Sequence, residues 1–133
     1  MSDTRKALEA GKVINQVLTS DATIKGYIGN KVYPLIADKG TTFPFIIYRR
    51  SSITPVDSKE GIYVTSAYYS VAIAAESYKD SISIARAVVG ALTSAKGEIQ
   101  GLNIQSISLT QSNEYWDDEF VQELTFKIDI DDE

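Results

Sequence analysis

The residues best suited to carry chemistry form one short stretch, Tyr115-Trp116-Asp117-Asp118-Glu119. Three consecutive carboxylates could hold Mg²⁺ or Ca²⁺, or could act as a general acid and base. Adjacent side chains of an extended chain point to opposite faces, however, so three in a row do not converge on one ion. The alternating acids, glycine and final glutamate of a calcium-binding loop are also absent. The pattern therefore favours an acidic turn between two strands.

The composition removes most other catalytic chemistry. The 133 residues include no histidine and no cysteine, which excludes Ser-His-Asp triads, Cys-His pairs, disulfides and metal sites built from either residue. The two glycines of Lys96–Gly101 follow a predicted helix, whereas a phosphate-binding loop precedes one. No cofactor or metal is predicted. A small carboxylate enzyme using Asp117 and Asp118 stays as an alternative.

Charge is distributed unevenly along the chain. The net charge is −5, and residues 113–133 hold nine of the 18 acids but one of the 13 bases. This polarity predicts either a solvated acidic edge or head-to-tail docking between copies. No basic arm or stripe indicates nucleic-acid binding. An acidic mimic of DNA is a weaker alternative, because −5 is a modest charge for this length.

Aromatic and arginine side chains could form an interface instead of a catalytic site. Tyrosine is enriched at interfaces because it combines buried area with a polar tip, although core packing is its commoner use. Trp116 could anchor a partner or cover the sheet edge of its own subunit. The Arg49-Arg50 pair could meet an anionic partner or simply end a strand. The candidate interface residues are Arg49, Arg50, Tyr63, Tyr69, Tyr115, Trp116, Asp117 and Asp118.

Hydrophobic periodicity predicts three helices. The first covers residues 4–19. The second, 22–28, begins at Ser20-Asp21 and ends at Gly29-Asn30, which tolerate a left-handed turn. The third begins at Ser77-Tyr78-Lys79-Asp80, which has the shape of a capping box, and ends by Gly97.

Strands are predicted at residues 31–36, 43–50, 62–75, 104–111 and 120–130, with a long loop or open hairpin at 51–61. One face of strand 62–75 is large and the other small, so either could be the buried one. Strand 120–130 alternates strictly enough to be half-buried. Helices do not separate successive strands, which argues against a parallel doubly wound sheet. The fold class is therefore α+β: one domain over residues 1–133, an antiparallel sheet with helices on one face.

Membrane insertion is not expected. No apolar run approaches the ~20 residues that span a bilayer, and the first residues lack the apolar core of a secretory signal.

The order and spacing of short motifs are informative along nearly the whole chain. The stretch VLTSDATIKGYIGNKVYPLIADKGTTFPFIIYRR carries L-x-x-D-x-x-I, then G-x-x-V-Y-P and then P-F-I-x-Y. The later segments VAIAAES, DSISIARAVVGAL and YWDDEF follow. In this order the motifs resemble the tail completion (tail terminator, head-tail joining) family of tailed bacteriophages and prophages. The 51–61 loop is longer than the family pattern, and arginine is rarer in the last strand.

The resemblance implies a structural virion protein. Family members form rings, typically of six copies, that cap the tail tube, stop its polymerisation and meet the head connector. It implies as partners other copies of the chain, the tail-tube protein and the head-tail connector proteins. Phage DNA would pass through the lumen without specific binding. The protein would occupy the host bacterial cytoplasm during assembly and then the head-proximal end of the virion tail. Another virion joining part, either a head-completion protein or a tail-tube subunit, is the alternative.

Overall fold

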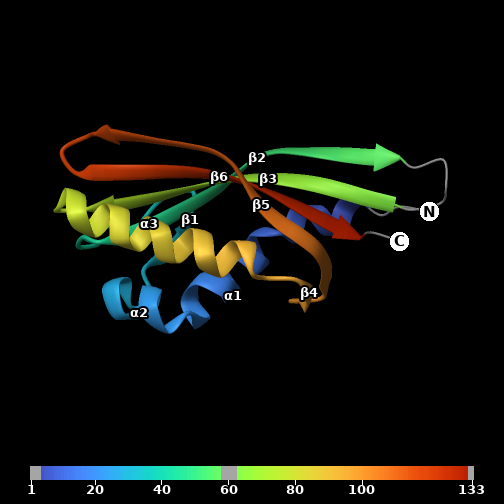
Figure 1. Cartoon of the computed structure of the whole chain (residues 1–133), viewed down its shortest axis with the longest axis horizontal. Coiled ribbons are helices and arrows are strands. Elements are labelled where there is room, and N and C mark those ends of the chain that lie inside the picture. Colours follow the sequence, from blue (N-terminus) through green and yellow to red (C-terminus); the bar gives the residue numbers. More distant parts are fainter. Residues whose placement is uncertain (1–3, 58–62, 132–133) are drawn as a thin grey trace.

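The computed structural model describes residues 4–57 and 63–131. A 3₁₀ helix and three α-helices lie against one face of a curved sheet (Figure 1). The elements in chain order are η1 (Thr4–Glu9), α1 (Gly11–Ser20), α2 (Ala22–Ile28), β1 (Val32–Pro34), β2 (Phe45–Asp57), β3 (Tyr63–Ala75), α3 (Tyr78–Thr93), β4 (Gly97–Ile99), β5 (Leu102–Trp116) and β6 (Phe120–Asp131). The predicted α+β class and the single helix-covered face are confirmed.

Within the described ranges, six strands form one sheet in the order β1-β2-β3-β6-β5-β4. Every neighbouring pair is antiparallel except β1 and β2, which are parallel. One row of paired residues crosses almost the whole sheet. It runs from Pro34 through Tyr48, Val71 and Leu124 to Ser112.

The helix-covered face is apolar. Its long strands contribute side chains with almost no exposure, among them Val71, Ile73, Phe126 and Ile128. This resolves the two-sided pattern of strand 62–75, because the large face is the one that packs under the helices. The small face carries serines and alanines, and no helix covers it (Figure 1).

The predicted first helix divides at Ala10 into η1 and α1. Gly11 lies so close to the sheet that an added Cβ would come 3.1 Å from the ring of Tyr48. The later helix boundaries follow their sequence signals. Asp21 accepts a hydrogen bond from the Ile24 N–H, and Ser77 accepts one from the Asp80 N–H at 3.1 Å, so both cap a helix start.

Two predicted boundaries are wrong. The strand predicted to end at Arg50 runs on, and of the predicted loop or open hairpin the hairpin is correct for Ser51–Asp57: these residues continue β2 and pair with β3 after a bulge between Arg50 and Ser52. The other residues of that predicted loop, 58–61, lie outside the described ranges. Strand β5 runs five residues beyond the predicted end at Gln111, because β6 pairs with it as far as Trp116. Residues 97–99 form the short strand β4, which the sequence pattern did not indicate.

None of the helices in the described part of the chain is both long and apolar enough to cross a bilayer.

Candidate functional site

The acidic stretch forms the tip of the long β5–β6 hairpin, which lies beside the start of α3 (Figure 1). Asp117, Asp118 and Glu119 make the turn, with the Asp117 N–H donating to the Glu119 carbonyl at 3.0 Å. Asp118 has a φ of 58°, a left-handed conformation that aspartate tolerates better than most residues. Among the described residues, no group of three or more His, Cys, Asp or Glu side chains could hold a metal ion. The tip is therefore a turn with exposed charges.

Trp116 lies on the surface of the hairpin tip. Its side chain is 63% exposed and packs edge-on against Phe120, with ring centroids 4.9 Å apart. Tyr78 at the start of α3 makes a second edge contact with Phe120 at 5.9 Å. Tyr115, on the opposite face of β5, is 47% exposed. Trp116 does not cover the core of its own subunit and is open to a partner.

Hydrogen bonds fix one carboxylate behind the tip. Gln122 donates to Glu114 at 2.9 Å and the Tyr78 hydroxyl donates at 3.0 Å. These bonds, with Gln122 the stronger influence, hold the pKa of Glu114 below its ordinary value, and the bond to Glu114 raises the pKa of Tyr78. Glu119 behaves oppositely: partial burial, then the charges of Asp117 and Asp118, raise its pKa.

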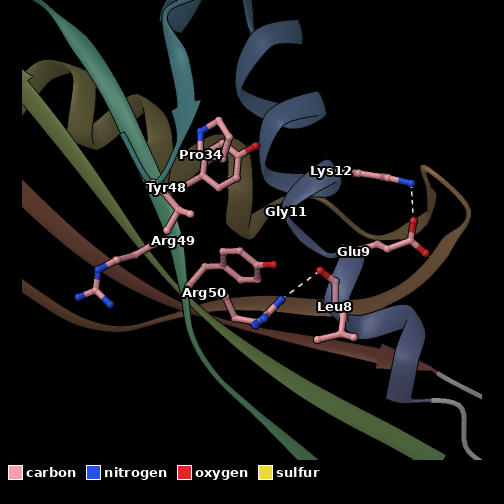
Figure 2. A pocket seen from close by; sticks show the side chains of 10 residues that line it. Leu8, Glu9, Gly11, Lys12, Pro34, Tyr48, Arg49 and Arg50 are labelled. Carbon is pink, nitrogen blue, oxygen red and sulfur yellow. Dashed lines mark hydrogen bonds and ion pairs between the residues drawn. The ribbon is translucent and has the colours of Figure 1, made fainter. Parts of the chain in front are cut away.

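Arg49 and Arg50 project to opposite sides of β2, because successive strand residues alternate (Figure 2). The Arg50 guanidinium donates to the Leu8 carbonyl of η1 at 3.1 Å. It also lies beside the hydroxyl of Tyr69. Burial raises the pKa of Tyr69, and the neighbouring Arg50 opposes that rise.

A cavity of about 460 Å³ lies beside Arg50 on the helix-covered side of the sheet (Figure 2). Leu8, Gly11, Pro34, Leu35 and Tyr48 contribute most of its apolar wall. Its volume is within the range of small-molecule sites. Three of its polar lining residues already have partners, since Lys12 pairs with Glu9 and Arg50 donates to the Leu8 carbonyl.

The eight candidate interface residues do not form one site in the subunit. Tyr115, Trp116, Asp117 and Asp118 lie at the hairpin tip, and Arg49 and Arg50 lie on β2, with β3 and β6 between the two strands. Tyr69 is 3% exposed and packs in the core. Tyr63 begins β3, but its side chain lies outside the described part of the chain. Their role at an interface stays a prediction.

Sequence reasoning missed the most exposed apolar pair. Leu35 and Ile36 are 73% and 77% exposed, the highest values for large hydrophobic residues in the described chain. The signal for them was available. Two aliphatic residues directly follow Pro34 and precede the polar loop Asp38–Thr42, where they cannot belong to a regular core pattern.

The helix-free face of the sheet is polar. Along β6 it carries Glu123, Lys127, Asp129 and Asp131. Asp129 accepts hydrogen bonds from Ser66 at 2.6 Å and Ser106 at 3.3 Å, each from a neighbouring strand. Lys127 lies 3.7 Å from the same carboxylate. These contacts form a charged layer along the middle of the face.

The model of the family described as "Tail completion protein gp17" matches residues 12–129. The chain belongs to the tail completion protein gp17 family. It is therefore a structural, non-enzymatic component of a virion tail. The predicted resemblance is confirmed, and the alternative of a carboxylate enzyme is excluded.

A solved chain of the virion of a native gene transfer agent particle has the same fold. It superposes with a TM-score of 0.78 at 15% identity, and the match covers 91% of this chain and 96% of that one. No curated protein sequence matches the chain significantly. The gp17 family match thus assigns the class of protein, and the structural likeness supports the fold.

Proposed function

We propose that this tail completion protein forms a closed ring that caps the tail tube, ends its polymerisation and joins the tail to the head connector. The observation that carries the proposal is the pair of open sheet edges. In the described chain β1 pairs with β2 only at Ile46–Tyr48, and β4 pairs with β5 only at Leu102–Ile104. Residues 49–57 of β2 and 105–116 of β5 therefore have no outer neighbour.

Long open edges are uncommon in a protein that acts alone, because unpaired backbone groups invite pairing with another chain. The two edges lie on opposite sides of the sheet, so contact between them is heterologous. Repeated heterologous contacts give a ring when the rotation between copies closes. Six copies is the number that the family resemblance implies.

The helix-free face is our candidate for the surface that lines the ring. Three acids and one base lie on it along β6, and a face of negative charge would repel DNA phosphates and let the genome pass without adhering. The variants Asp129→Asn and Asp131→Asn should slow DNA release from assembled particles while rings still form. Release at the wild-type rate would overturn the lining proposal and leave the capping proposal intact.

The capping function can be tested with the tail-tube protein of the same particle. Adding this protein to growing tubes should stop elongation at low molar ratio, and gold-labelled copies should mark one tube end in electron micrographs. Native mass spectrometry should give a ring mass. Label along the whole tube would indicate a tube subunit. A strict monomer at high concentration, without tube binding, would overturn the proposal.

A further inference from the structure

An apolar knob projects from the β1 edge of the sheet. The knob consists of Leu35 and Ile36, and it is held in place by hydrogen bonds. The Leu35 N–H donates to the Tyr48 carbonyl at 2.8 Å, and the Ile36 N–H donates to the Pro34 carbonyl at 2.7 Å, which closes a γ-turn. Leu35 at the centre of this turn has a φ of 66°.

The knob is unfavourable in an isolated subunit. A leucine with a left-handed backbone is strained, and both side chains leave most of their apolar surface in water. Asparagine or glycine would meet the same backbone demand without exposing a hydrocarbon side chain. The combination of strain and exposure indicates a surface that another molecule covers.

An apolar groove lies near the opposite edge of the sheet, between α3 and β5. Its volume is about 470 Å³. Ile82, Ala85 and Val89 of α3 form one wall, and Leu109 of β5 and Leu124 of β6 form the other. Gly90 also lines the groove, and a Cβ added there would have no atom within 4 Å. The glycine leaves the groove open where a side chain would occupy it.

Knob and groove lie at opposite ends of the same row of residues. The row begins at Pro34, directly before the knob, and ends at Ser112, which lines the groove. Both also lie on the helix-covered side, because Leu35 shares a cavity with Leu8 of η1 and the groove includes α3. Two copies placed edge to edge, level with each other, therefore bring the knob of one to the groove of the next.

The two edges also carry opposite net charges. Residues 31–56, which include β1 and most of β2, contain four bases and one acid. Residues 102–119, which include β5 and the hairpin tip, contain four acids and no base. In the level arrangement Arg49 and Arg50 of one copy lie opposite Gln111 and Leu109 of its neighbour. The four acids lie farther along the same edge, between Glu114 and Glu119. Opposite charges at the two edges also disfavour contacts between like edges.

We propose that Leu35 and Ile36 of each copy insert into the α3–β5 groove of the next copy, and that this contact fixes how each subunit is oriented relative to its neighbour in the ring. The inference rests on the proposed ring function, and it names the residues that connect one copy to its neighbour.

Two variants remove the two halves of the contact separately. Leu35→Asn with Ile36→Ser removes the knob and suits the left-handed backbone, so this subunit should fold as well as the wild type. Gly90→Phe fills the groove from an exposed helix position. Each variant should raise the dissociation constant of one subunit–subunit contact by about 100-fold or more, the loss expected when two aliphatic side chains no longer become buried. Native mass spectrometry against concentration measures this shift.

Mixing the variants gives the sharpest test. The knob variant keeps its groove, and the groove variant keeps its knob, so an equimolar mixture has one working contact per pair. It should form heterodimers and nothing larger. Gly26→Phe is the matched control, because Gly26 is also helical with no atom within 4 Å of an added Cβ but lies in α2. This control should assemble normally.

The outcomes separate the two proposals. If either variant forms rings at the same protein concentration as the wild type, the knob-and-groove contact is wrong, but the proposed ring is not affected. Loss of rings in Gly26→Phe as well would also count against the contact, because the effect would not be specific to the groove. A wild-type chain that is monomeric even with tail tubes would overturn the proposed function itself. Gly90→Glu is a second groove variant, for use if the larger phenylalanine impairs folding. It places a charge in the apolar groove and should weaken ring formation as Gly90→Phe does.

Discussion

The two faces of the central sheet bury side chains in different ways, although the same strands supply both. Under the helices, Val71 and Phe126 are completely buried among aliphatic neighbours. On the helix-free face, Ser66 and Ser70 are 3% and 5% exposed. These serines are covered by longer side chains of adjacent strands, and each donates a hydrogen bond to a β6 carboxylate.

The two faces therefore contribute differently to the free energy of folding. Apolar burial under the helices supplies most of the folding free energy, since it removes hydrocarbon from water. The other face is covered by charged groups that stay partly hydrated, and such groups contribute little net stability. Substitutions that change the charge of the helix-free face should therefore cost the fold little.

The largest expected effect comes from the helix-covered face. Phe126→Ala should lower the free energy of unfolding by about 3–5 kcal/mol, because it leaves a cavity in a close-packed core. Urea denaturation measures the change. Trp116→Ala is the control, with an expected loss below about 1.5 kcal/mol from its aromatic contact with Phe120. Equal losses in the two variants would contradict the comparison of a packed core with an exposed tip.

A smaller effect is expected on the helix-free face. Ser66→Ala removes the hydrogen bond to Asp129, which keeps its contact with Ser106, so the unfolding free energy should fall by about 1 kcal/mol. The same urea titration applies. A loss as large as that of Phe126→Ala would mean that the polar face is as important for stability as the core.

The smallest expected effect on stability concerns Glu114, and it should appear only at acidic pH. Hydrogen bonds from Gln122 and Tyr78 lower the pKa of Glu114 in the folded state. The contribution of Glu114 to folding stability is therefore present above the ordinary glutamate pKa of about 4.3. It is lost as pH falls through the lower pKa that Glu114 has in the folded state. Glu114→Gln should flatten the acid side of the stability profile. Thermal unfolding from pH 6 to pH 3 measures this.

Glu119→Gln should act in the opposite direction. Because the folded-state pKa of Glu119 is raised, the wild type gains stability as pH falls through that value, and the variant should lose this gain. Identical profiles of stability against pH for Glu114→Gln and Glu119→Gln would contradict the opposite pKa shifts of these two carboxyl groups.

Local sequence signals located the elements whose boundaries depend on nearby residues. Asp21 and Ser77 mark helix starts because their side chains accept hydrogen bonds from N–H groups three residues later. The alternation in residues 120–130 predicts β6 because one side of that strand faces the core. The acidic turn at Asp117–Glu119 was predicted from spacing alone. The lack of histidine and cysteine suits the structural role that the family resemblance implied.

Tertiary contacts decided the rest. Residues 51–57 are polar and contain Pro55, so their sequence favours a loop, but pairing with β3 at an edge of the sheet makes them a strand. The end of β5 has no apolar alternation because both of its faces are exposed, and only β6 holds it extended. The first helix breaks where Gly11 meets Tyr48, a contact between distant parts of the chain.

The sequence by itself determined the fold class, the family and the character of most segments, because hydrogen-bond caps and hydrophobic periodicity act over a few residues. The tertiary structure alone decided which surfaces are open. Leu35 and Ile36 are exposed, and Tyr69 is buried, because of where other strands and helices end. A local pattern can mark Leu35 and Ile36 as lying outside a regular core element, but whether another segment covers them depends on the packing of distant parts of the chain.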